Sequence, residues 1–209
     1  MPERRRRKFR LYFAIASLWS KVILRLMGIC VDIRYEGDRA VMDLSPCVIV
    51  ANHLALIDSL LLEAALRSFP RVWIVKFGLT KIPILSFIVR RMHVPVVSNN
   101  QVKMAAAFRK SIRLAKRNNS HLVLFPEGRR SLDGNLEKFT AGFAKAAIIL
   151  KRPVVPINIE GSDEVMKLGS PLFTSGKRIK LAVGSPMEAL PGEDHNEFCE
   201  RVHKWFSSK

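Results

Sequence analysis

Apolar and polar positions along the chain follow two alternating patterns. Short apolar runs bounded by Pro, Gly or Asn are typical of buried strands, and stretches with apolar residues three or four positions apart are typical of helices. Strands that alternate with helices predict an α/β fold in one domain, with a largely parallel central sheet flanked by helices. The predicted strands cover residues 31–36, 46–51, 71–76, 94–97, 121–125, 153–159 and 178–183, and the predicted helices cover residues 58–67, 81–91, 101–117, 142–151 and 196–206.

The N-terminal part of the chain has a pattern of its own. A dense basic cluster precedes the uncharged run Leu11–Ser20, which is too short to span a bilayer because that takes about 20 residues. On a helix, polar residues share one side and apolar residues cover much of the rest. This favours an amphipathic helix on the anionic surface of a membrane, at its cytoplasmic face. The polar side holds Arg10, Ser17, Lys21, Arg25 and Gly28; the chain divides into a basic, membrane-associating segment (1–30) and an α/β domain (31–209).

Two other interpretations of this segment remain open. It could be a core helix of the domain that follows a basic tail. It could also be a basic arm for nucleic acid, which is the weakest interpretation because the apolar face is too wide for that role.

The charge of the chain narrows the class of partner. The 209 residues carry a formal net charge of +17, and no acidic residue lies between Glu63 and Glu127, where twelve residues are basic. A positively charged surface attracts anions, so the charge alone leaves three kinds of partner open: nucleic acid, an anionic membrane surface or a phosphate-bearing substrate. The cysteines, Cys30, Cys47 and Cys199, have no spacing typical of disulfide frameworks or zinc sites, which favours a reducing compartment.

A histidine motif follows one of the predicted strands. Asn52 and His53 come directly after the apolar run 46–51, and Asp58 lies five positions after His53, where the next helix is expected to begin. A turn between strand and helix can bring imidazole and carboxylate together, so that the carboxylate fixes the tautomer of the histidine and stabilises its protonated form. The sequence therefore predicts a general base, His53, that is oriented by Asp58.

A second polar loop, Pro126–Ser131, follows the predicted strand 121–125. In α/β sheets ligands bind at the carboxyl ends of strands, and both polar loops lie at such ends. Gly128 lets the backbone approach a ligand, and two arginines can bind phosphate through planar, forked guanidinium groups. The predicted binding residues are Glu127, Gly128, Arg129 and Arg130. An ion-paired surface turn is the alternative interpretation of this loop.

Together the two motifs resemble the glycerolipid acyltransferase family typified by 1-acylglycerol-3-phosphate acyltransferase. The matching residues are Asn52-His53-x4-Asp58 and Phe125-Pro-Glu-Gly-Arg-Arg-Ser131, and Val154-Val-Pro-Ile157 fits a further block of the family. The resemblance runs from about residue 9 to residue 190, which is most of the chain. It implies a lysolipid acyltransferase.

The resemblance also implies the reaction and the roles of residues. A fatty acyl group would pass from acyl-CoA or acyl carrier protein to the free hydroxyl of a lysophospholipid, above all 1-acylglycerol-3-phosphate, which gives phosphatidic acid. His53 would be the general base and Asp58 would orient it, while the loop around Glu127, Gly128 and Arg130 would hold the acceptor headgroup. Neither a metal nor another cofactor is implied, and no nucleic acid partner is expected.

The chain departs from the family pattern at two positions. Arg129 stands where the family commonly has Thr, and Ser98 stands where it has an arginine that binds the acceptor phosphate. A different lysolipid acceptor, such as a lyso-ornithine lipid, therefore stays open. A basic membrane-binding or nucleic-acid-binding module is the non-enzyme alternative. The other histidines fit no metal-binding spacing and are expected to be ordinary surface or core residues: His93, His121, His195 and His203.

Overall fold

The computed structural model describes residues 3–38, 42–43, 45–76, 94–96, 100–131, 134–166 and 172–209. Their centre is a sheet of seven strands in the order β1-β7-β6-β2-β5-β3-β4. All neighbouring strands pair in parallel except β6 and β7, which are antiparallel. The predicted α/β fold with a largely parallel sheet is thereby confirmed. The strands are β1 (Cys30–Tyr35), β2 (Val48–Ala51), β3 (Arg71–Lys76), β4 (Val94–Val96), β5 (His121–Leu124), β6 (Val154–Glu160) and β7 (Arg178–Val183).

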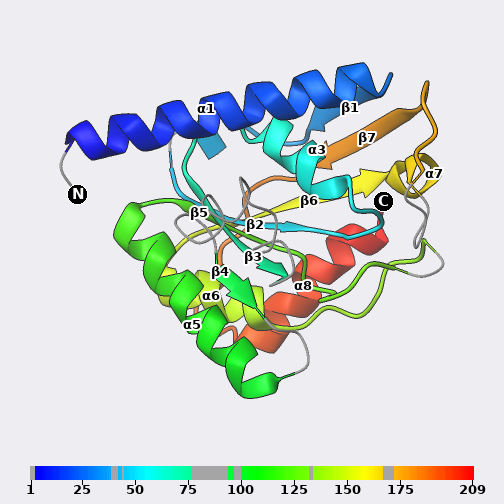
Figure 1. The fold of residues 1–209 in the computed structure, drawn as a ribbon. Coiled ribbons are helices and arrows are strands. Elements are labelled where there is room, and N and C mark those ends of the chain that lie inside the picture. Colours follow the sequence, from blue (N-terminus) through cyan, green and yellow to red (C-terminus); the bar gives the residue numbers. More distant parts are fainter. Residues whose placement is uncertain are drawn as a thin grey trace.

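Helices cover both faces of the sheet (Figure 1). Helices α1 and α3 lie on one face, and α5, α6 and α8 lie on the other. The short helix α7, directly after β6, was not predicted, and the predicted helix 81–91 lies outside the described residues. The helices are α1 (Glu3–Leu26), α3 (Asp58–Ala65), α5 (Gln101–Asn118), α6 (Gly142–Leu150), α7 (Ser162–Val165) and α8 (His195–Ser207).

The central strand β2 is packed from both sides. Ile49 belongs to an apolar cluster with residues of α1 and α3, whereas Val48 and Val50 belong to a second cluster with residues of α5, α6 and α8. This alternation follows from the two-residue period of a strand. All four residues of β2 are fully buried, as is typical of a central parallel strand. The chain that leaves the end of β2 therefore starts from a rigidly held position.

Helix α1 has one buried side and one exposed apolar side. Phe13 and Leu24 are buried beneath it, and the guanidinium of Arg71 lies 4.8 Å from the ring centre of Phe13. Ser17, which was predicted on a polar outer side, is instead buried and donates a hydrogen bond to the carbonyl of Ala64 in α3 at 3.2 Å. The exposed apolar side chains are Leu11, Ile15, Leu18, Trp19, Val22 and Leu26.

This apolar side is not long or hydrophobic enough to make a transmembrane segment. Across the described residues, no helix combines the length and the hydropathy that a membrane crossing requires. The exposed residues of α1 recur every three or four positions, so they form one stripe along the helix. In Figure 1 this helix lies along the outer edge of the fold.

Candidate active site

The structure brings the two predicted loops together at one edge of the sheet. Strands β2 and β5 are adjacent and parallel, with Val50 opposite Leu124. His53 follows the end of β2 and Glu127 follows the end of β5, so both residues leave the sheet on the same side. The backbone N–H of His53 donates a hydrogen bond to Oε1 of Glu127 at 2.9 Å, across 74 positions of sequence.

His53 and Asp58 form a direct side-chain contact. Nδ1 of His53 lies 2.8 Å from Oδ2 of Asp58. Because an ionised carboxylate can only accept, this contact places the ring proton on Nδ1 and leaves the lone pair on Nε2. The side chain of His53 is 20% exposed, whereas that of Asp58 is fully buried. Among the described residues, none forms a hydrogen bond with Nε2. Nδ1 of this partly exposed ring is thus held by Asp58, and Nε2 is left without a hydrogen-bond partner in the described part of the chain.

The turn before α3 is built around the carboxylate of Asp58. Its Oδ2 accepts hydrogen bonds from the backbone N–H groups of Leu54 and Ala55, at 2.7 and 2.8 Å, as well as from His53. Asp58 is also the first residue of α3, where the helix dipole favours a negative charge. These donors fix the carboxylate in position, and the position of the carboxylate fixes the imidazole.

Glu127 is mostly buried and holds the backbone of His53. Burial raises the pKa of Glu127 to about 7, although the backbone amides of His53 and Glu137 lower it in part. The same loop makes a second contact with the motif, because the N–H of Ser131 donates to the carbonyl of His53 at 2.8 Å. The peptide groups on both sides of the His53 side chain are therefore held by the loop that follows β5.

Two neighbours of His53 were not predicted as site residues. The ring of Phe125 stacks on the imidazole, with ring centres 4.0 Å apart and planes 13° from parallel. Asn52 exchanges two hydrogen bonds with the backbone of Ile159 in β6, at 2.9 and 2.7 Å. Both residues belong to the two motifs that match the family, but the sequence does not say which way either side chain points.

The remaining predicted binding residues lie on the exposed part of the same loop. Gly128 has a φ of +73°, and a Cβ there would meet no atom within 4 Å, so backbone conformation alone favours glycine. Arg129 is 63% exposed and makes an ion pair with Glu137, in which Nη2 lies 2.9 Å from each carboxylate oxygen. Arg130 has no ion-pair partner among the described residues.

Glu137 was not predicted to take part, and only its charge, eight positions after Arg129, could have suggested it. Ser98 and its basic neighbours Arg90 and Arg91 lie outside the described residues.

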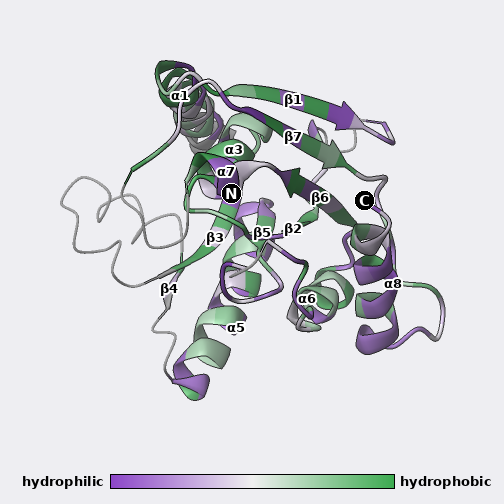
Figure 2. Ribbon diagram, turned by 90° about the vertical axis from the view of Figure 1, so that its right-hand side faces the viewer, coloured by the Kyte–Doolittle hydropathy of each residue, from purple (hydrophilic) through white to green (hydrophobic). Residues whose placement is uncertain are grey.

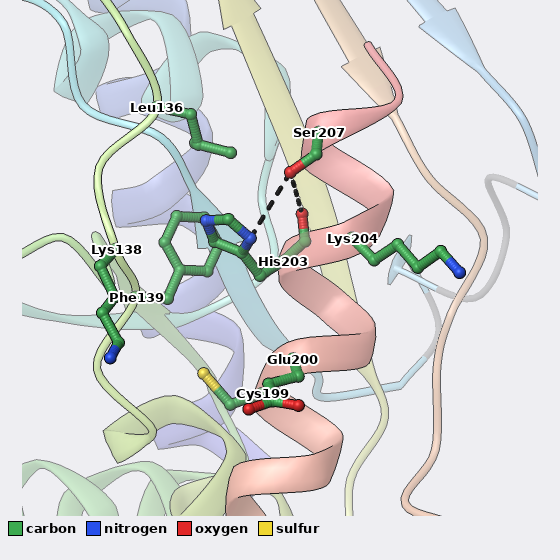
Figure 3. A pocket seen from close by; sticks show the side chains of 8 residues that line it. All are labelled: Leu136, Lys138, Phe139, Cys199, Glu200, His203, Lys204 and Ser207. Carbon is green, nitrogen blue, oxygen red and sulfur yellow. Dashed lines mark hydrogen bonds between the residues drawn. The ribbon is translucent and has the colours of Figure 1, made fainter.

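A separate depression lies between the chain before α6 and the last helix (Figure 3). His203 faces Phe139 across it, and Oγ of Ser207 lies 3.5 Å from Nδ1 of His203. None of the predicted site residues lines this depression. His203 has no carboxylate on its ring nitrogens in the described part of the chain, so this histidine lacks the arrangement found at His53.

Fold and site together define a class of protein: an α/β protein in which a buried carboxylate contacts a histidine at the carboxyl edge of a parallel sheet. The comparison with protein families gives the narrower assignment. The family model described as "Acyltransferase" matches residues 32–160, which include both motifs. The chain belongs to this acyltransferase family.

Several relatives carry names within this family. The chain is 28% identical to a chloroplastic 1-acyl-sn-glycerol-3-phosphate acyltransferase of Brassica napus, over 96% of this chain and 58% of the relative. It is 29% identical to one of Arabidopsis thaliana, over 94% and 55%. An enzyme of the same name from Pseudomonas aeruginosa is 25% identical, over 99% and 79%. The chain thus spans little more than half the length of the two plant relatives.

A solved structure shows the same fold. The crystal structure of the 1-acyl-sn-glycerophosphate acyltransferase PlsC from Thermotoga maritima superposes with a TM-score of 0.81, covering 100% of this chain and 82% of that one. The sequences are 24% identical, so the likeness concerns the architecture of the sheet and its helices.

Proposed function

We propose that this protein transfers a fatty acyl group from an acyl thioester to the free hydroxyl of 1-acylglycerol-3-phosphate, which yields phosphatidic acid. The observation that carries the proposal is the contact between Nδ1 of His53 and the buried Asp58, which leaves the lone pair on Nε2 of a partly exposed ring. The names of the relatives support the choice of acceptor.

The reaction needs one proton carrier and no acyl-enzyme. Nε2 of His53 accepts the proton of the acceptor hydroxyl while the hydroxyl oxygen forms a bond to the thioester carbonyl carbon. The buried charge of Asp58 stabilises the imidazolium that results. When the tetrahedral intermediate collapses, the carbon–sulfur bond breaks, and the imidazolium returns the proton to the leaving thiolate. The products are the new ester and the free thiol, and His53 regains its neutral form.

The acceptor headgroup binds at the loop of Glu127, Gly128, Arg129 and Arg130. The guanidinium of Arg130 has no ion-pair partner in the described part of the chain, so it is free to bind phosphate in a forked geometry. Arg129 is exposed but shares its charge with Glu137. Glu127 orders the loop against the His53 backbone, which sets the distance between headgroup and base.

The lysolipid acceptor is found in the membrane, and helix α1 supplies the contact between the protein and the membrane surface. Its stripe of exposed apolar residues enters the outer part of the bilayer at the cytoplasmic face, and exposed Lys21 and Arg25 meet anionic headgroups. The opposite side of the helix packs on α3, so the α/β domain is held close to the lipid surface.

An assay with the full chain tests the proposed reaction. Purified protein is mixed with 1-acylglycerol-3-phosphate or a lyso-ornithine lipid, and with acyl-CoA or acyl carrier protein charged with the same chain. We expect phosphatidic acid from 1-acylglycerol-3-phosphate and its loss in Arg130→Ala, mainly through a higher KM for the acceptor. Turnover of the lyso-ornithine lipid alone would refute the proposed acceptor, and absence of product from every combination would refute the reaction.

A second experiment tests the membrane contact. Deleting α1 would expose the core beneath Phe13 and Leu24, so substitutions on its outer side are the better test. We expect Leu18→Ser/Trp19→Ser to weaken binding to anionic liposomes by about tenfold, given the apolar area removed from the bilayer. The matched control is Ile149→Ser/Leu190→Ser, two exposed apolar residues elsewhere. Equal binding of both variants and the wild type would contradict the membrane role of α1.

A further inference from the structure

All charged residues on the exposed face of helix α5 are positive. The helix contains no acidic residue, and neighbouring cations at Arg109, Arg113 and Arg117 are four positions apart. Like charges at this spacing repel one another and destabilise a helix. None of the six exposed cations has an ion-pair partner in the part of the chain that the structure describes: Lys103, Arg109, Lys110, Arg113, Lys116 and Arg117.

Helix α8, on the same side of the sheet, shows how an ordinary solvated helix of this chain is composed. Its exposed residues include Glu197 and Glu200 as well as Lys204, and the guanidinium of Arg201 pairs with Glu193 at 2.7 Å. Opposite charges are therefore mixed on α8, as is usual for a surface that faces only water. The unmixed face of α5 is a local feature and not a consequence of the high net charge alone.

The membrane does not account for the face of α5. Helices α1 and α5 lie on opposite sides of the sheet, which both views show (Figures 1 and 2). A flat bilayer that contacts the outer side of α1 has the whole sheet between itself and α5. Electrostatic attraction to lipid headgroups falls off within about 8–10 Å at physiological salt. The partner of α5 is therefore expected in the aqueous phase.

The basic face also begins near the candidate active site. Helix α5 follows β4, so its first turn lies towards the carboxyl edge of the sheet, where His53 is placed. Near the middle of α5, the ring of Phe108 lies next to Gly142. Two residues before Gly142, the backbone N–H of Thr140 donates a hydrogen bond to the carbonyl of Pro126, the first residue of the loop that follows β5. A partner on α5 thus lies beside the loop that holds the acceptor.

From these observations we infer that the face of α5 docks an acidic acyl carrier protein, which presents the acyl thioester to His53. The inference rests on the proposed acyl transfer and names its donor. A carrier protein is soluble and acidic, and it holds its acyl group on a long flexible prosthetic arm that can reach from α5 to the edge of the sheet. Exposed apolar Val102 and Met104 at the start of α5 add a small contact surface next to the cations.

Direct binding tests the docking surface without any need for turnover. The affinity of fluorescently labelled acyl carrier protein for the full chain is measured by anisotropy, with Arg109→Glu/Arg113→Glu as the test variant. The control Lys145→Glu/Lys204→Glu makes the same change in net charge on α6 and α8. We expect the test variant to bind at least about tenfold more weakly, and the control to bind like the wild type. Arg109→Gln/Arg113→Gln serves if the reversal impairs folding.

Kinetics and liposome binding separate the docking proposal from the proposed reaction. In the test variant we expect a higher KM for acyl carrier protein, an unchanged KM for acyl-CoA of the same chain, and unchanged liposome binding. Weaker liposome binding in the test variant would assign α5 to the membrane and overturn the inference. No binding of the carrier by the wild type, or equal loss in test and control variants, would also overturn it. Failure of the proposed reaction shows itself differently, as absence of product with both donors.

Discussion

Two histidines lie at opposite ends of the adjacent strands β2 and β5, and they have nearly opposite properties. Each lies against a phenylalanine ring: His53 stacks on Phe125 with ring centres 4.0 Å apart, and His121 is tilted by 35° to Phe69 with ring centres 4.2 Å apart. The difference lies in what faces Nδ1. In His53 it faces the carboxylate of Asp58, and in His121 it accepts the backbone N–H of Cys47 at 2.9 Å.

His121 is held in its neutral form by its surroundings. Complete burial is the main reason why its pKa falls to about 3, and the positive charges of Arg71 and Arg152 lower it further. A proton on Nδ1 would also displace the hydrogen bond from Cys47. His121, at the start of β5, therefore accepts the hydrogen bond from the backbone N–H of Cys47 and takes no part in proton transfer.

The comparison teaches that the partner of one ring nitrogen decides the role of the other. A carboxylate that accepts from Nδ1 makes Nε2 basic and stabilises the charged ring. A backbone donor on Nδ1 places the proton on Nε2 and removes the basic site. Contact with a phenylalanine ring does not distinguish the two histidines, whereas burial does, because the side chain of His53 is 20% exposed and His121 is fully buried. The following variants test this contrast.

Removal of the proposed base should have the largest effect. We expect His53→Ala to lower kcat by about 10²–10⁴-fold, the range for loss of a positioned general base. Thermal unfolding should change little, since the side chain is partly exposed and the backbone bonds to Glu127 and Ser131 remain. Steady-state kinetics and a thermal melt check this. Undiminished turnover would contradict the role of His53.

Asp58→Asn removes the negative charge beside His53 while it keeps the hydrogen-bond geometry, so it tests the contribution of the charge alone. An amide oxygen in the place of Oδ2 can still accept from Leu54, Ala55 and His53, but the negative charge is gone. We expect kcat to fall by about 10²–10³-fold, with the fold retained. A variant with wild-type kcat would show that orientation, and not charge, is the contribution of Asp58.

Glu127→Gln should change how stability depends on pH. Because the pKa of Glu127 is raised from 4.5 to about 7 in the folded chain, the folded state binds more protons than the unfolded state in this window. As pH rises from 4.5 to 7, this group should therefore lower the free energy of unfolding of the wild type by up to about 3 kcal/mol.

Glu127→Gln should not lose stability between pH 4.5 and pH 7 in this way, so it should be more stable than the wild type at pH 8. Denaturant unfolding across pH measures the difference, with exposed Glu200→Gln as control. An identical pH dependence of variant and wild type would exclude a raised pKa at Glu127.

His121→Leu should act on stability and not on chemistry. It leaves the N–H of Cys47 without its acceptor, which costs about 1–3 kcal/mol in free energy of unfolding. Since the folded-state pKa of His121 lies below 6.5, this group lowers the free energy of unfolding of the wild type as pH falls from 6.5 towards 3. The variant should lack this acid-induced loss of stability. Acyl transfer per folded molecule should stay close to the wild-type value. A large loss of kcat in a folded variant would break the contrast with His53.

Much of the fold was predictable because buried parallel strands are apolar throughout. Strand β2 is apolar in every residue and β6 in most, and both were placed within one or two residues of their bounds. The order of the strands and the antiparallel pairing of β6 with β7 depend on contacts between distant segments, which no local pattern encodes. The side on which α1 packs was also missed, since Ser17 is small enough to lie against α3 although it is polar.

The residues of the candidate site were easier to predict than their contacts. His53, Asp58 and Glu127 stood out by residue type, by spacing and by their position after apolar runs. That Glu127 accepts from the backbone amide of His53 follows from β2 and β5 being neighbours, which the sequence does not state. The ion pair of Arg129 with Glu137 was missed for a similar reason, because it depends on how the loop folds back on itself.

The pair of backbone contacts at His53 has a consequence for protein engineering. Glu127 and Ser131 hold the amide and carbonyl of the same residue, so the loop proposed to select the acceptor and the histidine proposed to activate it move as one body. A loop grafted from a relative with another acceptor would shift the imidazole unless it restores both contacts. Exchange of specificity in this scaffold therefore requires Glu127 to be kept and the backbone N–H of position 131 to stay in contact with the His53 carbonyl, while the positions between them are varied.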